Sequence, residues 1–172
     1  MKPFIDHLQR RTAQSAIGPS ALRNQGAAGV VAGARTALEN LNLTKYSYAS
    51  PETFAELLDQ DTSAILKCFP ARAQSWGAAR KGLNLFLRDA TYNIDLNSAY
   101  NLSSIRCLLE VPLDRDIANA LLGQPEGHSL PKWASIKGLT KSISDKYQLA
   151  ALEVASRYKV NRIDLDIFFW RQ

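Results

Sequence analysis

Signals for helices recur along this chain, and no segment carries the pattern of a β-hairpin. Apolar residues return at intervals of three and four, as Phe54, Leu57 and Leu58 do, which is the spacing of one helix face. Ser50-Pro51 is typical of a helix start, with serine as the cap and proline in the first turn. No run of alternating apolar and polar residues is bounded by turn residues, as a strand pair requires. The sequence therefore predicts an all-α fold.

Glycine, proline and capping residues divide the helical pattern into segments. We expect helices over 3–15, 21–41, 78–90, 115–122 and 165–171, one from Pro51, one from Asp61 to Pro70, a helical or turn-rich piece over 92–102, and one capped by Ser142 or Ser144 that reaches Tyr158. Three glycines weaken the helix over 21–41. Trp76-Gly77 suggests a hairpin turn, and 123–131 suggests a flexible loop.

Length and charge limit the size of the fold and the class of partner. A chain of 172 residues, 46% of them hydrophobic, fits one domain or one domain with two lobes. The formal net charge of +5 is concentrated at the ends, with +4 in residues 1–45 and +4 in 131–172, whereas 46–130 carries −3. If both ends fold onto one side, they form a face suited to the phosphate backbone of a nucleic acid.

The reactive side chains give no sign of a metal or cofactor. Cys68 and Cys107 stand among apolar residues, which predicts buried free thiols and a reducing compartment. His7 and His128 fit no metal-binding spacing, and no phosphate-loop or dinucleotide fingerprint is present. No apolar run approaches the ~20 residues of a membrane span, and the N-terminus lacks a signal peptide's apolar core. We expect a cytoplasmic monomer without metal, cofactor or membrane contact.

Lys81 is the first candidate for chemistry. It opens the run Lys81-Gly-Leu-Asn-Leu-Phe-Leu-Arg-Asp89, which reads as the start of a strong helix. The positive end of the helix dipole and the neighbouring Arg80 favour an uncharged amine, the form that attacks a sugar carbon. The alternative interpretation is an ordinary solvated surface lysine.

Asp114 is the second candidate. It precedes the helix over 115–122, so its carboxylate is expected to accept backbone N–H groups as an N-cap and to stay ionised. A carboxylate fixed beside a glycosidic bond stabilises the positive charge that develops on the sugar as a base leaves. The alternative is a capping aspartate with no further role.

A third element lies at the C-terminus. Asp166 and Trp170 are four residues apart and share a helix face. A carboxylate beside a large aromatic ring suits an extruded base, with one group on its edge and the other on its plane. The alternative is a core tryptophan beside an exposed aspartate.

Several polar and basic residues are candidates for contact with DNA. Arg23 and Asn24 stand beside a glycine, which suits close approach to a nucleic acid or an ordinary loop. Basic side chains that neutralise phosphates supply most of the affinity for a nucleic acid. The candidates for DNA contact are Arg23, Asn24, Arg72, Arg80, Lys137 and Lys141.

Three motifs together resemble a known superfamily. They are Lys81-Gly-Leu-Asn-Leu-Phe, Val111-Pro-Leu-Asp114-Arg-Asp-Ile-Ala and Leu165-Asp166-Ile-Phe-Phe-Trp170. The chain resembles the helix-hairpin-helix DNA glycosylases, and most closely their archaeal oxidised-guanine glycosylase/lyase branch. The motifs bracket roughly the C-terminal 60% of the chain.

The resemblance implies a two-lobed all-α fold with a cleft between the lobes. One lobe would consist of about 1–68 with the C-terminal helix, and the other of about 69–160. The Leu-Pro-Gly-Val-Gly hairpin of the family is absent here, and Phe69–Gly77 occupies its place.

The resemblance also implies roles for single residues. A lysine matching Lys81 forms a Schiff base with the deoxyribose, and an aspartate matching Asp114 assists it. Asp166 and Trp170 match residues that contact the extruded base, and Gln25 is the match for a glutamine that reads it.

The resulting hypothesis is a DNA glycosylase that excises a modified base from duplex DNA, with or without lyase activity on the abasic site. The base would be an oxidised guanine, excised in repair, or a hypermodified phage base, excised in anti-phage defence. Two other classes remain open from the residues alone. They are a non-catalytic helical DNA-binding module and a helical adaptor for other proteins.

Overall fold

Every described element of this protein is a helix. The computed structural model describes residues 2–22 and 28–169, and those ranges contain no β-strand, which confirms the predicted all-α class. The α-helices are α1 (Lys2–Ala16), α2 (Val30–Glu39), α3 (Pro51–Lys67), α4 (Trp76–Tyr92), α5 (Ile94–Tyr100), α6 (Arg115–Leu122), α7 (Lys141–Tyr158) and α8 (Leu165–Phe168). Short 3-10 helices are η1 (Leu43–Tyr46), η2 (Ala71–Ala73), η3 (Leu102–Ile105), η4 (Pro125–Gly127) and η5 (Arg162–Asp164).

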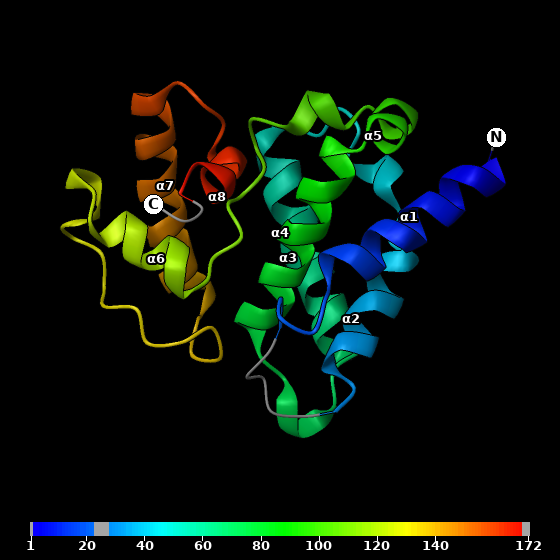
Figure 1. Ribbon diagram of the computed structural model, residues 1–172, viewed down its shortest axis with the longest axis horizontal. Coiled ribbons are helices and arrows are strands. Elements are labelled where there is room, and N and C mark those ends of the chain that lie inside the picture. Colours follow the sequence, from blue (N-terminus) through cyan, green and yellow to red (C-terminus); the bar gives the residue numbers. More distant parts are fainter. Residues whose placement is uncertain (1, 23–27, 170–172) are drawn as a thin grey trace.

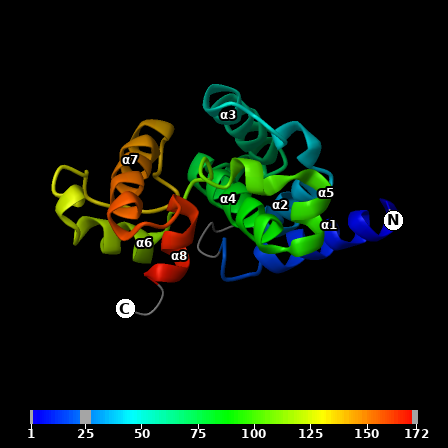
Figure 2. The ribbon, with the colours of Figure 1, turned by 90° about the horizontal axis from the view of Figure 1, so that it is seen from above.

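The helices form two groups, each around its own apolar cluster. Figures 1 and 2 show α1–α5 on one side and α6–α8 on the other. Leu58 and Phe86 belong to the first cluster, whereas Leu121 and Tyr147 belong to the second. Burial of such side chains is the main favourable term in folding.

The division between the clusters differs from the predicted boundary after residue 68. The first cluster runs to Leu109 and also takes in Ile163, whereas the second begins at Val111. The reason is that α4 packs along α3, which keeps residues beyond 68 with the first group. Leu165 and Phe169 of the C-terminal segment pack in the second cluster, although the sequence had placed that segment with the N-terminal part.

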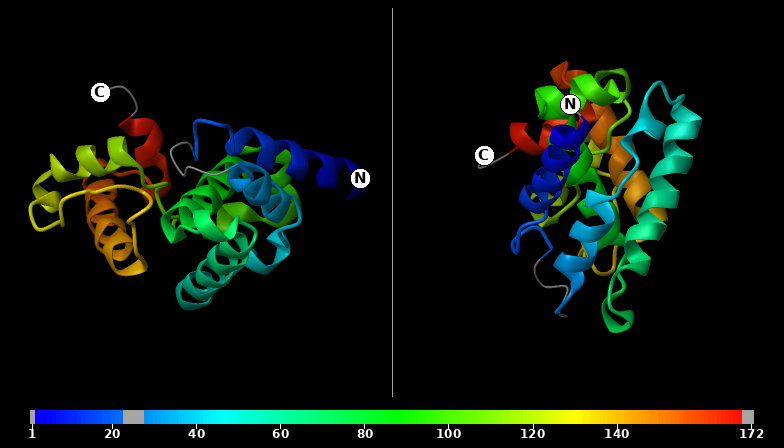
Figure 3. Two further views of the ribbon diagram at one scale, coloured as in Figure 1. Left: turned by 90° about the horizontal axis from the view of Figure 1, so that it is seen from below. Right: turned by 90° about the vertical axis from the view of Figure 1, so that its right-hand side faces the viewer.

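The two ends of the chain lie mostly in different helical groups. The N-terminal end of α1 lies at the far end of the first group, and α7 and α8 lie in the second (Figures 1 and 3). Ser20 and Ala21, after α1, nevertheless line the same pocket as Lys137. The basic face expected from both ends stays a prediction.

Local capping explains where most helices begin. Ser50 Oγ accepts a hydrogen bond from Thr53 N at the start of α3, and Ser75 Oγ accepts one from Ala78 N at the start of α4. Trp76-Gly77 thus lies in the first turn of α4 and does not form the expected hairpin turn. Thr140, and neither predicted serine, caps α7.

Two predicted helices differ from the observed ones for identifiable reasons. Within the helix expected over 21–41, α2 begins at Val30, because Gly29 adopts a left-handed conformation with φ of 100° just before it. No new helix begins at Asp61, since α3 continues through it. The Asp61 carboxylate contacts Lys45 and Tyr46 instead of capping.

Two polar side chains, the partly buried Arg162 and the buried Gln148, hold the connection between the groups. Arg162 donates to the carbonyl oxygens of Leu108 (2.7 Å) and Leu109 (3.1 Å). Gln148 pairs with both the N–H (3.1 Å) and the carbonyl (2.8 Å) of Val111. Burial lowers the pKa of the Arg162 guanidinium, and the charge of Glu110 opposes that shift. These bonds fix the relative placement of the groups.

The described residues also bear on the expectations for thiols, metals and membranes. Cys68 and Cys107 are free, as expected, but both are exposed, so the prediction of buried thiols is wrong. Within 2–22 and 28–169, no group of three or more histidine, cysteine or carboxylate side chains is placed to hold a metal ion. No helix in those ranges combines the length and the apolar character that a membrane span requires.

Gly77 lies in close contact with the loop that follows Pro131. A Cβ at Gly77 would lie 2.2 Å from Ile136 O and 2.7 Å from Leu139 Cβ, so the loop after Pro131 packs directly on the first turn of α4. We expect Gly77→Ala to lower the free energy of unfolding by about 1–3 kcal/mol, as overpacking does. Urea unfolding of Gly77→Ala and Gly82→Ala checks this, because a Cβ at Gly82 has only an ordinary contact at 3.5 Å. Equal stability of the two variants would contradict the prediction.

Candidate active site

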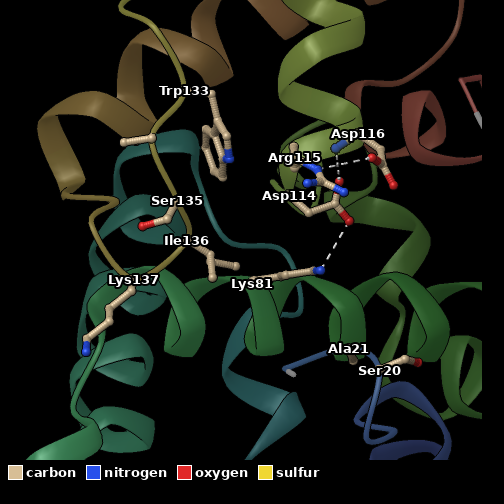
Figure 4. A pocket seen from close by; sticks show the side chains of 11 residues that line it. Ser20, Ala21, Lys81, Asp114, Arg115, Asp116, Trp133, Ser135, Ile136 and Lys137 are labelled. Atoms are coloured by element: carbon tan, nitrogen blue, oxygen red, sulfur yellow. Dashed lines mark hydrogen bonds and ion pairs between the residues drawn. The ribbon is translucent and has the colours of Figure 1, made fainter. Parts of the chain in front are cut away.

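The structure brings Lys81 and Asp114 into direct contact. Lys81 Nζ donates a hydrogen bond to Asp114 Oδ2 over 3.1 Å, and the two groups form an ion pair. Lys81 comes from α4 and Asp114 from the start of α6, so the contact joins the two helical groups (Figure 4). The Lys81 side chain is 11% exposed and that of Asp114 is 34% exposed. An amine and a carboxylate 33 residues apart therefore converge beside a solvent-accessible space.

Lys81 lies in the second turn of α4, and not at the helix start that the sequence predicted. The helix begins at Trp76, and the influence of the dipole falls off beyond the first turn. The neighbouring Arg80 points to a different face, where it pairs with Asp59 and Glu110. The charged group closest to the amine in this arrangement is the Asp114 carboxylate.

Asp114 uses its two carboxylate oxygens for different partners. Oδ1 accepts hydrogen bonds from Asp116 N and Ile117 N, both at 3.0 Å, and so caps α6 as predicted. Oδ2 contacts Lys81. The backbone bonds fix the orientation of the carboxylate, which leaves Oδ2 directed toward the amine.

Two pockets meet at Asp114. We call the first the lysine pocket; its volume is about 510 Å³. It is lined by Ser20, Ala21, Lys81, Asp114, Arg115, Asp116, Trp133, Ala134, Ser135, Ile136 and Lys137. We call the second the aspartate pocket; its volume is about 1170 Å³. It is lined by Arg88, Asp89, Tyr92, Asp114, Asp116, Ile117, Asn119, Ala120, Gln124, Asp166, Ile167 and Phe169. Asp114 and Asp116 line both, so the spaces adjoin at the Lys81–Asp114 pair.

Asp166 lies in the aspartate pocket, paired with a residue that the sequence analysis missed. Arg88 Nη1 donates to Asp166 Oδ2, and Arg88 Nε donates to Asp89 Oδ1 over 2.8 Å. Arg88 stands seven residues after Lys81, which is two turns along the same face of α4. The seven-residue spacing from Lys81 could have identified Arg88 as a site residue from the sequence.

Asp164 lies behind the aspartate pocket and holds Tyr92, which lines it. Its Oδ1 accepts hydrogen bonds from Tyr92 Oη (2.7 Å) and Arg106 Nη2 (3.0 Å). Burial alone raises the pKa of Asp164, but the hydrogen bonds from Tyr92, Arg106 and Asn161 outweigh it and hold that pKa below its usual value. Burial, together with the bond and charge of Asp164, raises the pKa of Tyr92, so its hydroxyl stays a donor at neutral pH.

The other predicted site residues are scattered. Arg72 is exposed on η2, away from both pockets, and Lys137 is exposed at the edge of the lysine pocket. Lys141 is exposed at the start of α7, where it pairs with Asp59 and Asp145. The predicted residues Arg23, Asn24, Gln25 and Trp170 lie outside the described residues.

The placement of Arg80 does not fit a contact with DNA. Arg80 is only 3% exposed, so its guanidinium does not reach a phosphate from this position. It donates to Thr62 Oγ1 (2.9 Å) and Asp59 Oδ1 (2.6 Å). Its Nε lies 3.1 Å from Glu110 Oε2, within ion-pair distance but outside hydrogen-bonding geometry. Arg80 is therefore a buried residue of the core that pairs with acidic side chains.

The arrangement brings together an amine, a fixed carboxylate and two adjoining spaces, which are the parts that attack on a bound carbon centre requires. Comparison with models of protein families, with curated proteins and with solved structures found no match to this chain.

Proposed function

We propose that this protein is a DNA glycosylase that removes a modified base from duplex DNA, using Lys81 as nucleophile and Asp114 as its carboxylate partner. The observation that carries the proposal is the 3.1 Å contact between Lys81 Nζ and Asp114 Oδ2 at the junction of two pockets. The sequence resemblance to helix-hairpin-helix glycosylases supports the same pair of roles.

The proposed reaction begins when the Lys81 ammonium loses a proton to water and the resulting amine attacks C1′ of the target nucleotide. The bond from C1′ to the base nitrogen breaks, and its electron pair leaves with the base, which takes a proton from water. Asp114 Oδ2 stabilises the positive charge on the sugar and accepts the proton that the amine loses. Opening of the sugar ring then gives an imine between Lys81 and C1′, from which β-elimination breaks the strand.

The two helical groups would be the lobes of the helix-hairpin-helix type, and the adjoining pockets would form the cleft between them. Duplex DNA binds across this cleft, and one nucleotide rotates out of the stack at a cost of a few kcal/mol. In place of the family's hairpin the chain has η2 and the cap of α4, so backbone contact there differs from the family pattern.

The extruded base would enter the aspartate pocket, where Asp166 reads its edge. Trp170 and Gln25 complete the base contacts in this proposal. Asp166 is paired with Arg88 in the structure, so the base has to share or displace that partner. The proposal covers an oxidised guanine and a hypermodified phage base alike, because Lys81 attacks the sugar in either case.

Incubation with a panel of duplexes that carry oxidised, alkylated, mismatched or phage-type modified bases tests the proposal. We expect release of one class of free base, detected by mass spectrometry, and loss of that release below detection in Lys81→Ala. Lys67→Ala is the matched control, because Lys67 is an exposed lysine outside both pockets. Release by Lys81→Ala at the rate of Lys67→Ala would contradict the proposal.

The same panel separates the other two classes. Salt-sensitive binding of DNA with no base released from any duplex identifies a non-catalytic DNA-binding module. Absence of DNA binding even at low salt identifies a protein adaptor.

A further inference from the structure

The two pockets differ in charge. The lysine pocket contains the cationic side chains of Lys81, Arg115 and Lys137, and its carboxylates, Asp114 and Asp116, both lie on the border shared with the aspartate pocket. Among the described residues, the aspartate pocket adds one cation, Arg88, and two further carboxylates, those of Asp89 and Asp166. A phosphate is therefore favoured on the lysine side of the Lys81–Asp114 pair and disfavoured on the other.

Trp133 gives the lysine pocket an aromatic wall. Its ring is half-buried and meets the ring of Tyr147 edge to face, with centroids 5.6 Å apart and an interplanar angle of 83°. Tyr147 is fully buried and donates a hydrogen bond from its hydroxyl to Pro131 O over 2.7 Å. Burial raises the pKa of Tyr147, so this donor persists at neutral pH. Tyr147 thus fixes the position of the Trp133 indole, which lines the pocket.

The loop that carries Trp133 is seated firmly on α4. Ile136 O lies against Gly77, where no side chain intervenes, and accepts a hydrogen bond from Ser75 Oγ over 3.4 Å. Figure 4 shows Trp133 and Ser135 on this loop, with Lys81 extending from α4 toward Asp114 across the pocket. The aromatic wall, the nucleophile and the carboxylate therefore have a fixed mutual arrangement.

We propose that the lysine pocket holds the nucleotide next to the target in the same strand, with Trp133 stacked on its base and Arg115 and Lys137 pairing with its phosphates. This inference rests on the proposed function. A volume of about 510 Å³ lies within the usual range for small-ligand sites, which is enough for one nucleotide. An aromatic face with flanking cations is the combination that binds a single nucleic-acid strand without regard to sequence.

The contact of Trp133 with the second apolar cluster offers a competing role, that of a packing residue. Two substitutions separate the roles. Trp133→Leu keeps an apolar side chain but cannot stack, whereas Trp133→Phe keeps a ring. Both remove volume from the same place, so thermal unfolding of each variant measures a packing defect separately from DNA binding.

Binding of these variants to a duplex with a tetrahydrofuran abasic site measures the contact without any excision. We expect Trp133→Leu to bind roughly tenfold more weakly than wild type, as loss of one stacked base requires, and Trp133→Phe to bind like wild type. A second duplex carries 5-iodouracil next to the abasic site, and its photo-cross-link in wild type is expected to map to Trp133.

Unchanged affinity of Trp133→Leu, an equal loss in both variants, or a cross-link that maps elsewhere would overturn this inference. Because the abasic duplex holds no base to remove, these results are independent of base release. A protein that excises a base but tolerates Trp133→Leu would refute the stacking role and leave the proposed function standing.

Discussion

Asp114→Asn is expected to reduce base excision by about 100-fold or more while leaving the fold intact, as loss of one transition-state charge partner does. The asparagine oxygen can still accept the hydrogen bonds that Oδ1 receives from Asp116 N and Ile117 N, so α6 stays capped. The negative charge that faces Lys81 at 3.1 Å is lost. Single-turnover rates of base release, measured beside thermal unfolding, report the two effects separately.

Two further variants make this result specific. Asp114→Ala removes the cap as well as the charge, so it should lose activity and also about 1 kcal/mol of stability. Asp95→Asn removes an exposed carboxylate that lies outside both pockets, and it should excise the base at close to the wild-type rate. A wild-type rate in Asp114→Asn, or an equal loss in Asp95→Asn, would contradict the role given to Asp114.

Glu110→Ala is expected to lower the free energy of unfolding by about 3 kcal/mol, the effect of removing one partner from a buried ion-pair network. Glu110 is 9% exposed and lies 3.1 Å from the buried Arg80 guanidinium. Its Oε2 also accepts a hydrogen bond from Asn84 over 2.9 Å. Removal of the carboxylate leaves Asn84 without this acceptor and takes one of two acidic partners from Arg80. Urea denaturation at neutral pH measures the loss.

The controls for this prediction separate charge from hydrogen bonding. Glu110→Gln keeps an oxygen for Asn84 and should lose less stability than Glu110→Ala. Glu56→Ala, at an exposed position of α3, should change stability by no more than about 0.5 kcal/mol. If Glu110→Ala is as stable as Glu56→Ala, the buried pair contributes nothing to the fold.

Local signals in the sequence predicted the parts of the fold that local interactions determine. Ser50-Pro51 begins α3, and Asp114 and Gly123 bound α6, because capping involves only residues within one turn. Tertiary contacts decide the cases that failed. Asp61 resembles a cap in sequence, but it lies in mid-helix and its carboxylate meets Lys45 and Tyr46 from an earlier segment.

The candidate site was predictable only in part, for a related reason. The sequence resemblance pointed to Lys81 and Asp114, which do meet in space. Arg80 is not part of the site, although it is next to Lys81 in the sequence. Adjacent residues on a helix point about 100° apart, so Arg80 is buried on another face of α4. Trp133 carries no motif, and only the folding of its loop onto α4 brings it beside Lys81.

Reductive trapping on a natural abasic site tests the pairing of Lys81 with a deoxyribose most directly, since it requires no knowledge of the base. The protein is incubated with an aldehyde-bearing abasic duplex and cyanoborohydride, digested, and analysed by mass spectrometry. We predict that the sugar adduct is found on Lys81 and disappears in Lys81→Ala but not in Lys67→Ala. An adduct spread over exposed lysines such as Lys132 and Lys137, with the same yield in Lys81→Ala, would contradict the assignment of Lys81 as the nucleophile.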